Sequence, residues 1–345
     1  MQMISGKYAN ARAFWLSRAL RIYIPYFAAL FLSLLCAAAL WKLEGELGPC
    51  SGFGSAPLTR NTLCGLIAAT ITNITILGQD LALFVTADAG AGFGFTYDFH
   101  AIPSPLHHYI LIPQAWTIGL ELYFYALVPY LATSSTRLLW CILGSSLTLR
   151  ILGYSLLSLT NDPWLYRFFP FEISLFVAGM LVWRHSESRL SRFEIKWSTT
   201  KYIAFIATAT LLFWITRKIV SFGFRFFSYE FLVQVSYIMW LVLVPLLFQI
   251  TKKHRFDRFL GELSYPIYLL HMAVIPFAAM LCRRQPSLNF SLTATGLTIF
   301  LSVVFVVFLI RPLDAMRARL HNITKVAAVD PFVAETNQQP DSEAP

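Results

Sequence analysis

The sequence predicts an all-α membrane protein, a polytopic helical bundle of about eight transmembrane helices plus one re-entrant or interfacial segment. Of the 345 residues, 57% are hydrophobic and only 13% are charged, whereas soluble domains carry roughly 25% charged residues. The apolar residues fall in long runs, and about 20 of them in a helix cross a hydrocarbon layer of about 30 Å. The runs neither alternate strictly nor show regular turn spacing, which excludes a transmembrane β-barrel and a disordered chain.

Eight spans are predicted, with bounds at 22–41, 116–132, 138–158, 164–183, 202–216, 230–250, 260–281 and 291–310. Because eight is even, both termini lie on one side. Eighteen Lys and Arg residues then fall on that side and seven on the other. The positive-inside rule makes the richer side cytoplasmic, so a cytoplasmic C-terminus is expected. The basic residues are scattered between apolar runs, which favours membrane topology over nucleic-acid binding.

One apolar stretch, Leu63 to Val85, does not fit this topology as a full span. It contains six polar residues: Thr70, Thr72, Asn73, Thr75, Gln79 and Asp80. A crossing there would invert every downstream loop and place basic loops outside. We therefore predict a re-entrant or interfacial segment whose polar groups are buried against protein. With it, residues 42–115 form a long non-cytoplasmic excursion of the kind that carries function or covers a site.

The chain divides into a transmembrane domain at 1–321 and an acidic cytoplasmic tail at 322–345, which is predicted to be disordered. The five cysteines show no metal-ligand spacing, and no metal site is predicted. They are interpreted as small hydrophobic residues. Cys50 and Cys64 share one polar loop, so a disulfide between them stays open if that loop faces an oxidising compartment.

Placing an ionisable side chain within a membrane span costs free energy, so each such residue is a candidate functional group. Four of them stand out: Glu121, Arg150, Glu172 and His271. Helical spacing places Glu121 on one face with Thr117 and Tyr125. Its carboxylate either takes part in chemistry, by orienting a histidine or accepting a substrate hydroxyl, or forms a structural pair with Arg150. Both alternatives remain open at this point.

Ser264, Tyr268 and His271 fall on one helical stripe. Imidazole is the natural proton acceptor for a hydroxyl near neutral pH, although a core histidine bonded to a neighbouring helix explains the stripe equally simply. His107 and His108 lie in the outer excursion just before Trp116, where a substrate could reach them.

Arg18 and Arg21 lie one helical turn apart at the cytoplasmic end of the first span. Two guanidinium groups on one face suit the phosphates of a nucleotide or coenzyme. Anchoring by the positive-inside rule would also place them there. The sequence contains no Walker loop, G-x-G-x-x-G or G-x-S-x-G motif.

Three motifs, in this order, resemble those of the acyltransferase-3 family of integral membrane O-acyltransferases. The first is Ile4-Ser5-Gly6 followed by FWLSRALRIYIPY at 14–26, similar to a Ser-Gly, an R-x-x-R and an R-I-x-P-x-Y. The second is WTIGLELYFY at 116–125 with Pro129, similar to W-S-L-x-x-E-x-x-F-Y-x-x-x-P. The third is SYPIYLLH at 264–271, similar to S-Y-x-I-Y-L-x-H.

This resemblance implies that acyl-coenzyme A, often acetyl-coenzyme A, is the donor substrate, with no permanently bound cofactor. The acyl group would pass to a hydroxyl of a carbohydrate or glycolipid acceptor, as in polysaccharide O-acetylation, in a bacterial inner membrane. Arg18 and Arg21 would hold the coenzyme phosphates, and Glu121 and His271 would be catalytic. The residues expected to bind substrate are Trp116, Tyr125, Ser264, Tyr268 and His108.

The sequence departs from the family at its beginning. Family members normally carry two further transmembrane helices before the Ser-Gly, and the first bears an R/K-x10-H motif whose histidine is taken as the general base. None of the seven histidines has Arg or Lys eleven positions before it. We therefore expect this chain to lack the family's first two transmembrane helices. Two other functions stay open: a transporter of a glycan precursor, and a non-catalytic scaffold or fragment, which the absent base favours.

Overall fold

A computed structural model describes residues 10–45, 47–50, 53, 60–88, 92–101, 106–164, 166–190, 200–201, 204, 207–208, 211, 255–285, 287 and 289–316. The predicted span at 230–250, most of the span at 202–216, the acidic tail at 322–345 and the Ser5-Gly6 pair lie outside the described residues.

The described chain is mainly helical. Its α-helices are α1 (Ala11–Glu44), α3 (Arg60–Thr75), α4 (Trp116–Thr133), α5 (Thr136–Leu157), α6 (Phe169–Leu190), α9 (Arg255–Arg284) and α10 (Phe290–Phe305), which continues as the π-helix η6 (Val306–Ile310). Short 3-10 helices lie at η1 (Gly48–Cys50), η2 (Leu81–Phe84), η3 (Phe99–Ala101), η4 (Leu106–Tyr109) and η5 (Pro113–Ala115). Strands β1 (Val85–Asp88) and β2 (Gly92–Phe95) form one antiparallel hairpin in which Val85 pairs with Phe95.

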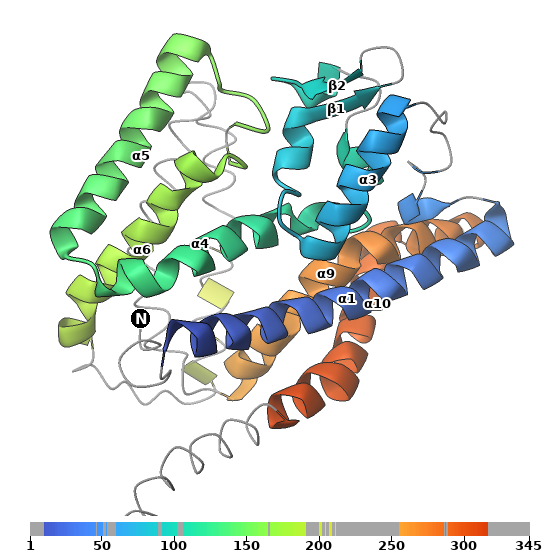
Figure 1. The fold of residues 1–345 in the computed structure, drawn as a ribbon. Helices are drawn as coiled ribbons and strands as arrows, with labels where there is room; N and C mark the ends of the chain where they lie inside the picture. The colour runs from blue at the N-terminus through green and yellow to red at the C-terminus, as the bar shows by residue number, and fades with distance from the viewer. Residues whose placement is uncertain are drawn as a thin grey trace, which may run out of the picture.

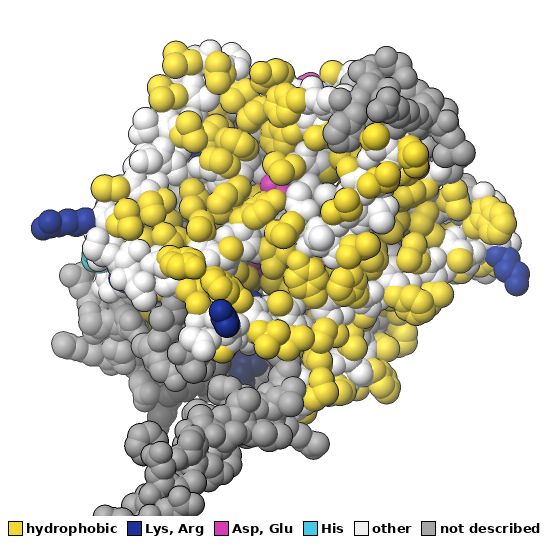
Figure 2. All heavy atoms as spheres, viewed as in Figure 1, with side chains coloured by type: hydrophobic (Ala, Val, Ile, Leu, Met, Phe, Trp, Pro, Cys, Tyr) yellow, Lys and Arg dark blue, Asp and Glu magenta, His cyan; other side chains and the backbone are white. Residues whose placement is uncertain are grey.

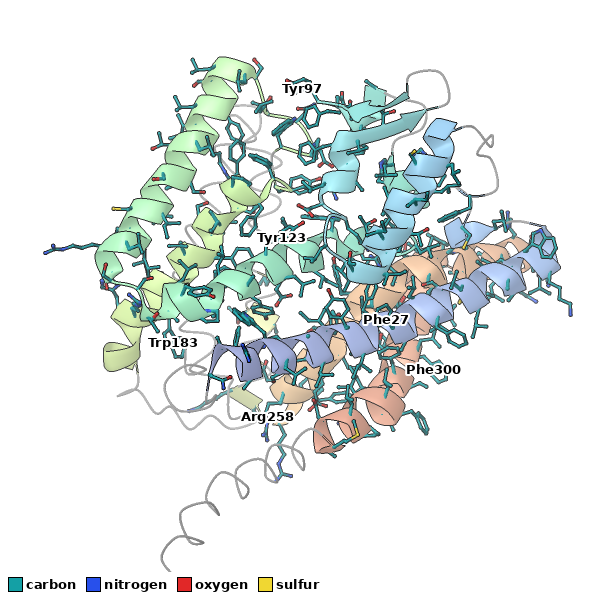
Figure 3. All side chains as sticks on the ribbon, in the orientation of Figure 1. Phe27, Tyr97, Tyr123, Trp183, Arg258 and Phe300 are labelled. Carbon is teal, nitrogen blue, oxygen red and sulfur yellow. The ribbon has the colours of Figure 1, made fainter. Side chains whose placement is uncertain are left out.

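The predicted fold class, an all-α membrane protein, is confirmed. Within the described residues, four helices are long and apolar enough to cross a membrane: α1, α5, α9, and α10 continued to Met316. Hydrophobic side chains are spread across the described surface in Figure 2, with few charged side chains among them. Phe27 and Phe300 point outward from α1 and α10 and are 42% and 64% exposed (Figure 3). Exposed aromatic rings suit a lipid environment. The number of eight spans stays a prediction.

Helix α1 is longer than the span predicted at 22–41. Asn10 caps its start by accepting a hydrogen bond from the Ala13 N–H at 2.9 Å, and Gly45, with φ of 73°, ends it. Its 34 residues extend about 51 Å at about 1.5 Å per residue. The helix therefore exceeds the apolar layer, because its first turns carry the basic residues of the chain's start.

Figure 1 shows α5 and α6 packed as a pair on one side and α1, α9 and α10 packed together on the other, with α4 between the two groups. Ion pairs join both ends of the second group. Glu44 at the end of α1 pairs with Arg284 at the end of α9 at 2.7 Å. Glu262 near the start of α9 pairs with Arg311 after η6 at 3.3 Å. These contacts fit the predicted order of crossings, in which α1 and α9 run in the same direction.

The stretch at 63–85 is not one continuous helix. Helix α3 ends at Thr75, and the chain turns through Ile76 and Gly78, whose φ angles are 64° and 81°. A β-branched residue in this left-handed region is uncommon, so surrounding contacts must hold the turn. The polar residues of the stretch supply some of these contacts.

Buried polar side chains fix this turn against the bundle. The Asn73 amide donates to the Tyr109 carbonyl and accepts from the Leu111 N–H, both at 2.9 Å. The Tyr26 hydroxyl of α1 donates to the Asn73 carbonyl at 2.8 Å and accepts from Gln79 at 3.0 Å. The prediction that polar groups of this stretch are buried against protein is confirmed for Asn73, Gln79 and Asp80, whereas Thr70 is exposed.

Helix α4 packs closely on the same turn. A Cβ atom placed on Gly119 would lie 3.2 Å from the Ile76 carbonyl oxygen and 3.4 Å from the Asp80 carboxylate. Ile76 also belongs to a hydrophobic core formed with Ile22 and Tyr26 of α1, residues before and within α4, and Leu269 and Leu270 of α9. The core therefore lies where α1, α4, α9 and the turn meet.

All five cysteines are free thiols. The disulfide considered for Cys50 and Cys64 is not formed in the structure, and no group of three or more metal-ligating side chains occurs among the described residues.

Replacing Asn73 with Ala is expected to destabilise the protein. The change leaves the buried Tyr109 carbonyl and the part-buried Leu111 N–H without their partner, and the buried group alone costs about 1–3 kcal/mol. Thermal unfolding in detergent measures the effect. Thr70→Ala is the matched control, because Thr70 is exposed on the same helix and donates to the Leu66 carbonyl within that helix. Equal melting temperatures for the two variants would contradict this expectation.

Candidate functional site

Helix α4 carries a polar stripe, defined as Thr117, Glu121 and Tyr125, on one face. The Tyr125 hydroxyl donates a hydrogen bond to Oε1 of Glu121. The Thr117 hydroxyl contacts the Tyr268 hydroxyl of α9. The start of the stripe therefore faces α9, and the Glu121 carboxylate accepts a hydrogen bond from a phenol of its own helix.

Hydrogen bonds join the start of α4 to the middle of α9. Gln114 donates from Nε2 to the carbonyl oxygens of Tyr268 and Leu269 at 3.1 and 2.9 Å. The Tyr268 hydroxyl donates back to the Gln114 carbonyl. A phenol has one hydrogen to donate, so in the contact between Tyr268 and Thr117 the threonine hydroxyl is the donor. Two of the three sequence motifs thus meet directly.

Arg18 is buried where α1 passes α4. Its guanidinium carbon lies 5.1 Å from the ring centroid of Tyr125 and 5.6 Å from that of Phe14, distances typical of cation–π contacts. Trp15 fixes the same crossing by donating from its indole nitrogen to the Tyr125 carbonyl at 3.0 Å. Arg21, one turn further along α1, is exposed. The two arginines that the sequence paired therefore occupy different environments.

Arg150 pairs with Glu172 and not with Glu121. Its Nη2 donates to Oε1 of Glu172 at 2.6 Å and to the Phe171 carbonyl at 2.9 Å. Both side chains of the ion pair are at least 90% buried. The alternative that Glu121 is the structural partner of Arg150 is wrong. Because Glu121 receives a phenol hydrogen bond instead of a cation, it stays a candidate for chemistry.

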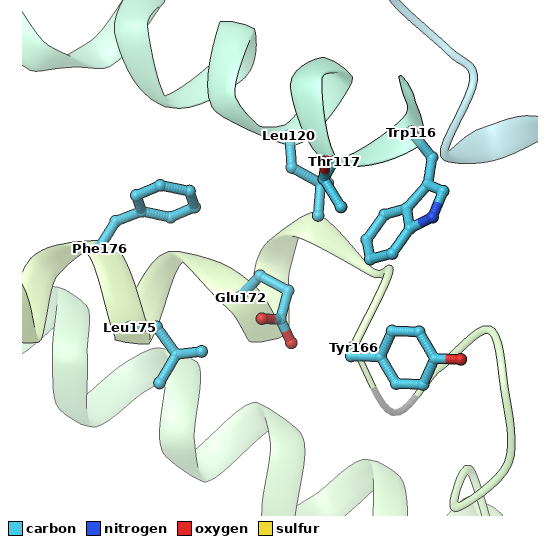
Figure 4. A pocket seen from close by; sticks show the side chains of 7 residues that line it. All are labelled: Trp116, Thr117, Leu120, Tyr166, Glu172, Leu175 and Phe176. Atoms are coloured by element: carbon cyan, nitrogen blue, oxygen red, sulfur yellow. The ribbon is translucent and has the colours of Figure 1, made fainter. Parts of the chain in front are cut away.

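Two pockets border α4. The larger, here called the Trp116 pocket, has a volume of about 550 Å³ and is lined by Trp116, Thr117, Leu120, Tyr166, Glu172, Leu175 and Phe176 (Figure 4). The smaller, here called the Arg18 pocket, has a volume of about 360 Å³ and is lined by Trp15, Arg18, Ala19, Leu122, Tyr125 and Ala126.

These pockets lie on opposite faces of α4. Successive residues of an α-helix are rotated by about 100°. The α4 positions of the Trp116 pocket, 116, 117 and 120, are therefore centred on one side of the helix, and those of the Arg18 pocket, 122, 125 and 126, on the opposite side, with Thr117 and Tyr125 at the adjoining edges of the two groups. Glu121 falls between the two faces, about 90° from each. A carboxylate is thus placed on the helix edge that separates two binding spaces.

His271 lies on α9, one turn after Tyr268. Its Nδ1 contacts the carbonyl oxygens of Ile267 and Tyr268 at 3.2 and 2.9 Å. Carbonyl oxygens only accept, so Nδ1 holds the proton in the neutral ring and Nε2 carries the lone pair. Within the described chain, no hydrogen bond joins His271 to Glu121. Ser264 is exposed and donates to the Gly261 carbonyl of its own helix at 2.8 Å.

His107 and His108 lie in η4, with ring centroids 4.6 Å apart. Burial, and then the nearby charges of His108 and Arg167, lowers the pKa of His107 to about 4. His107 is therefore neutral near pH 7. His108 is exposed, and the described residues give it no contact with the polar stripe of α4.

Asp162, Tyr166 and Gln114 border the site but lie in connecting segments that no motif marks. Asp162 accepts hydrogen bonds from Tyr166 at 2.8 Å and from Arg167 at 2.6 and 2.9 Å. Arg167 in turn lies over the Trp116 ring, 4.4 Å from its centroid. The dense charged and aromatic sequence DPWLYRF at 162–168 is the signal from which this cluster could be found.

A multi-pass helical membrane protein with polar groups held inside its bundle is the class that this fold and site define. Residues 3–311 match the acyltransferase-3 family, described as an acyltransferase domain. Because the match covers most of the chain, the chain belongs to this family and is a membrane acyltransferase. An uncharacterized protein of Aquifex aeolicus (strain VF5) is 30% identical over 164 residues, which cover 46% of this chain and 68% of that protein. No solved structure matches the chain.

The lowered pKa of His107 predicts an acid-dependent loss of stability. Between the unfolded value of about 6.5 and the folded value of about 4, the unfolded chain binds the proton and the folded chain does not. Stability should therefore fall as the pH drops through this window. As the pH is lowered, the melting temperature of a His107→Gln variant should fall less than that of the wild type. The melting temperature of His100→Gln, a variant of an exposed histidine, should fall as much as that of the wild type. If the melting temperatures of all three proteins fall equally as the pH drops, this prediction is refuted.

Proposed function

We propose that this membrane acyltransferase transfers an acyl group, most simply acetyl, from acyl-coenzyme A to a hydroxyl of a carbohydrate or envelope glycan. The observation that carries the proposal is the pair of pockets that border α4: Leu120, directly before Glu121, lines one pocket, and Leu122, directly after it, lines the other. A transfer between two substrates needs two binding spaces that reach one reacting group. The excess of basic residues on one side supports a bacterial inner membrane protein with a cytoplasmic C-terminus.

The Arg18 pocket is assigned to the donor. It lies toward the start of α1, which the distribution of basic residues places on the cytoplasmic side, where acyl-coenzyme A is available. Its volume of about 360 Å³ and mainly apolar lining suit an acyl thioester arm instead of the whole coenzyme. Arg18 borders this space, and the exposed Arg21 lies one turn away for the charged end of the coenzyme.

The Trp116 pocket is assigned to the acceptor. It lies at the start of α4 and of α6, the ends that the predicted topology places on the non-cytoplasmic side. Thr117 belongs both to this pocket and to the polar stripe. An acceptor hydroxyl bound near Thr117 would therefore be directed toward Glu121, one turn further along the same helix.

In the proposed reaction, the acceptor hydroxyl loses its proton to a base and its oxygen attacks the thioester carbonyl carbon. The carbon–sulfur bond breaks, an ester forms, and coenzyme A leaves as a thiolate that takes up a proton. Glu121 is proposed as the base: Oε1 accepts from Tyr125, and Oε2 accepts no hydrogen bond from the described residues. Nε2 of His271 is the alternative proton acceptor.

Arg18→Ala is expected to weaken the binding of acetyl-coenzyme A by about 10- to 100-fold, because a hydrogen bond to a charged group contributes about 1.5–3 kcal/mol. Calorimetric titration of the purified protein in detergent measures this change. Arg137→Ala is the matched control, since Arg137 is an exposed arginine outside both pockets. Equal affinities in the two variants would remove Arg18 from the donor site.

Glu121→Gln is expected to lower acyl transfer by about 10²–10⁴, the usual contribution of a general base, with unchanged affinity for acetyl-coenzyme A. Transfer of labelled acetyl groups from acetyl-coenzyme A to envelope glycans measures it. If His271→Gln shows this loss and Glu121→Gln does not, the base assignment moves to His271. A wild-type protein that neither binds acetyl-coenzyme A nor transfers its acetyl group would refute the proposed function.

A further inference from the structure

The Trp116 pocket has an aromatic and polar lining that is more specific than the binding of an arbitrary hydroxyl group requires. Two aromatic rings, Trp116 and Tyr166, border it with centroids 5.7 Å apart and planes tilted by 48°. Figure 4 shows the Trp116 ring extending from α4 toward Tyr166, with the Glu172 carboxylate on the opposing helix α6. We propose that this pocket binds one pyranose ring, with Trp116 and Tyr166 as its platform and Glu172 as the acceptor of a sugar hydroxyl.

The aromatic platform is held rigid from behind. The guanidinium carbon of Arg167 lies 4.4 Å from the Trp116 ring centroid and 5.0 Å from that of Tyr166. Asp162 fixes the cation through two hydrogen bonds and also accepts from the Tyr166 hydroxyl. Both rings are therefore oriented before any ligand arrives, which reduces the entropy lost on binding.

Glu172 presents a hydrogen-bond acceptor to the pocket. Its side chain is 10% exposed, and Arg150 occupies Oε1 at 2.6 Å. Oε2 accepts no hydrogen bond from the described residues, while Glu172 lines the pocket. A purely apolar ligand in the pocket would remove this carboxylate oxygen from water without giving it a hydrogen-bond donor, which is costly. A ligand with hydroxyl groups supplies the missing donor.

The charges around the pocket balance. Glu172 is matched by Arg150, and Asp162 is matched by Arg167, so neither an anionic nor a cationic ligand finds an uncompensated partner. The C–H faces of a pyranose ring pack on aromatic rings, and its hydroxyls donate to carboxylates. A neutral sugar ring therefore fits the lining better than a phosphate, an ammonium group or a lipid chain. The volume of about 550 Å³ lies within the range of small-ligand pockets.

This inference rests on the proposed function, because it gives the carbohydrate acceptor its binding site. It goes beyond the proposed function by assigning Tyr166 and Glu172 a role in recognising the sugar. It also separates recognition of the sugar, on one face of α4, from the Glu121 carboxylate at the edge of that face.

The test is titration of the purified full chain in detergent with a panel of neutral methyl pyranosides, followed by ligand-detected NMR. The wild type should bind at least one of them. Trp116→Leu, which removes the platform, and Leu175→Trp, which fills the pocket without altering a charge, should each weaken binding by about tenfold or more. The exposed Trp140 lies on α5 outside both pockets, so Trp140→Leu should bind as the wild type does.

Acetyl-coenzyme A affinity, measured on the same samples, reports folding and separates the two proposals. Weakened sugar binding with unchanged donor affinity supports the pocket. Absence of pyranoside binding to the wild type, or wild-type binding in both pocket variants, would overturn the sugar site and leave the donor site standing. Sugar binding by a wild type that does not bind acetyl-coenzyme A would instead defeat the proposed function.

Discussion

Polar groups that leave water must find partners inside the protein, because each unpaired buried group costs about 1–3 kcal/mol. This requirement determines how the bundle is assembled. Asn73 connects the end of α3 to Tyr109 of η4, Gln79 connects the turn after α3 to α1, and Gln114 connects the start of α4 to α9. These bonds are directional, whereas contacts between apolar helices leave helix rotation weakly defined. They therefore fix which face of α4 meets α9, and with it the position of Glu121.

Much of the fold follows from the sequence, because apolar runs of sufficient length must form helices in a membrane. The runs at 116–132, 138–158 and 260–281 correspond to α4, α5 and α9. The polar residues in the run at 63–85 distinguish it from these apolar runs. The bounds of α1 were not predictable from hydropathy, because capping by Asn10 starts the helix among basic residues that lie outside the apolar run.

Less of the candidate site was predictable. Periodicity alone places Thr117, Glu121 and Tyr125 on one face. Which carboxylate Arg150 meets depends on how α5 and α6 are rotated against each other, and sequence spacing within one helix carries no such information. The same reason separates Arg18 from Arg21: an i, i+3 pair shares a face, but here α4 covers only one of its members. Asp162 and Arg167 lie in the segment between α5 and α6, where no helical periodicity of the sequence predicts their contact.

Gly119 has a mechanical consequence for this enzyme. Its missing side chain lets the backbone of α4 rest almost directly on the Ile76 carbonyl and beside Asp80. This close seating opposes rotation of α4 about its long axis, so the helix would form a rigid wall between the two proposed substrate sites. In the proposed reaction, any adjustment needed to bring the two substrates together would then fall to side-chain torsions along this helix, chiefly those of Tyr125 and the Glu121 carboxylate to which it donates.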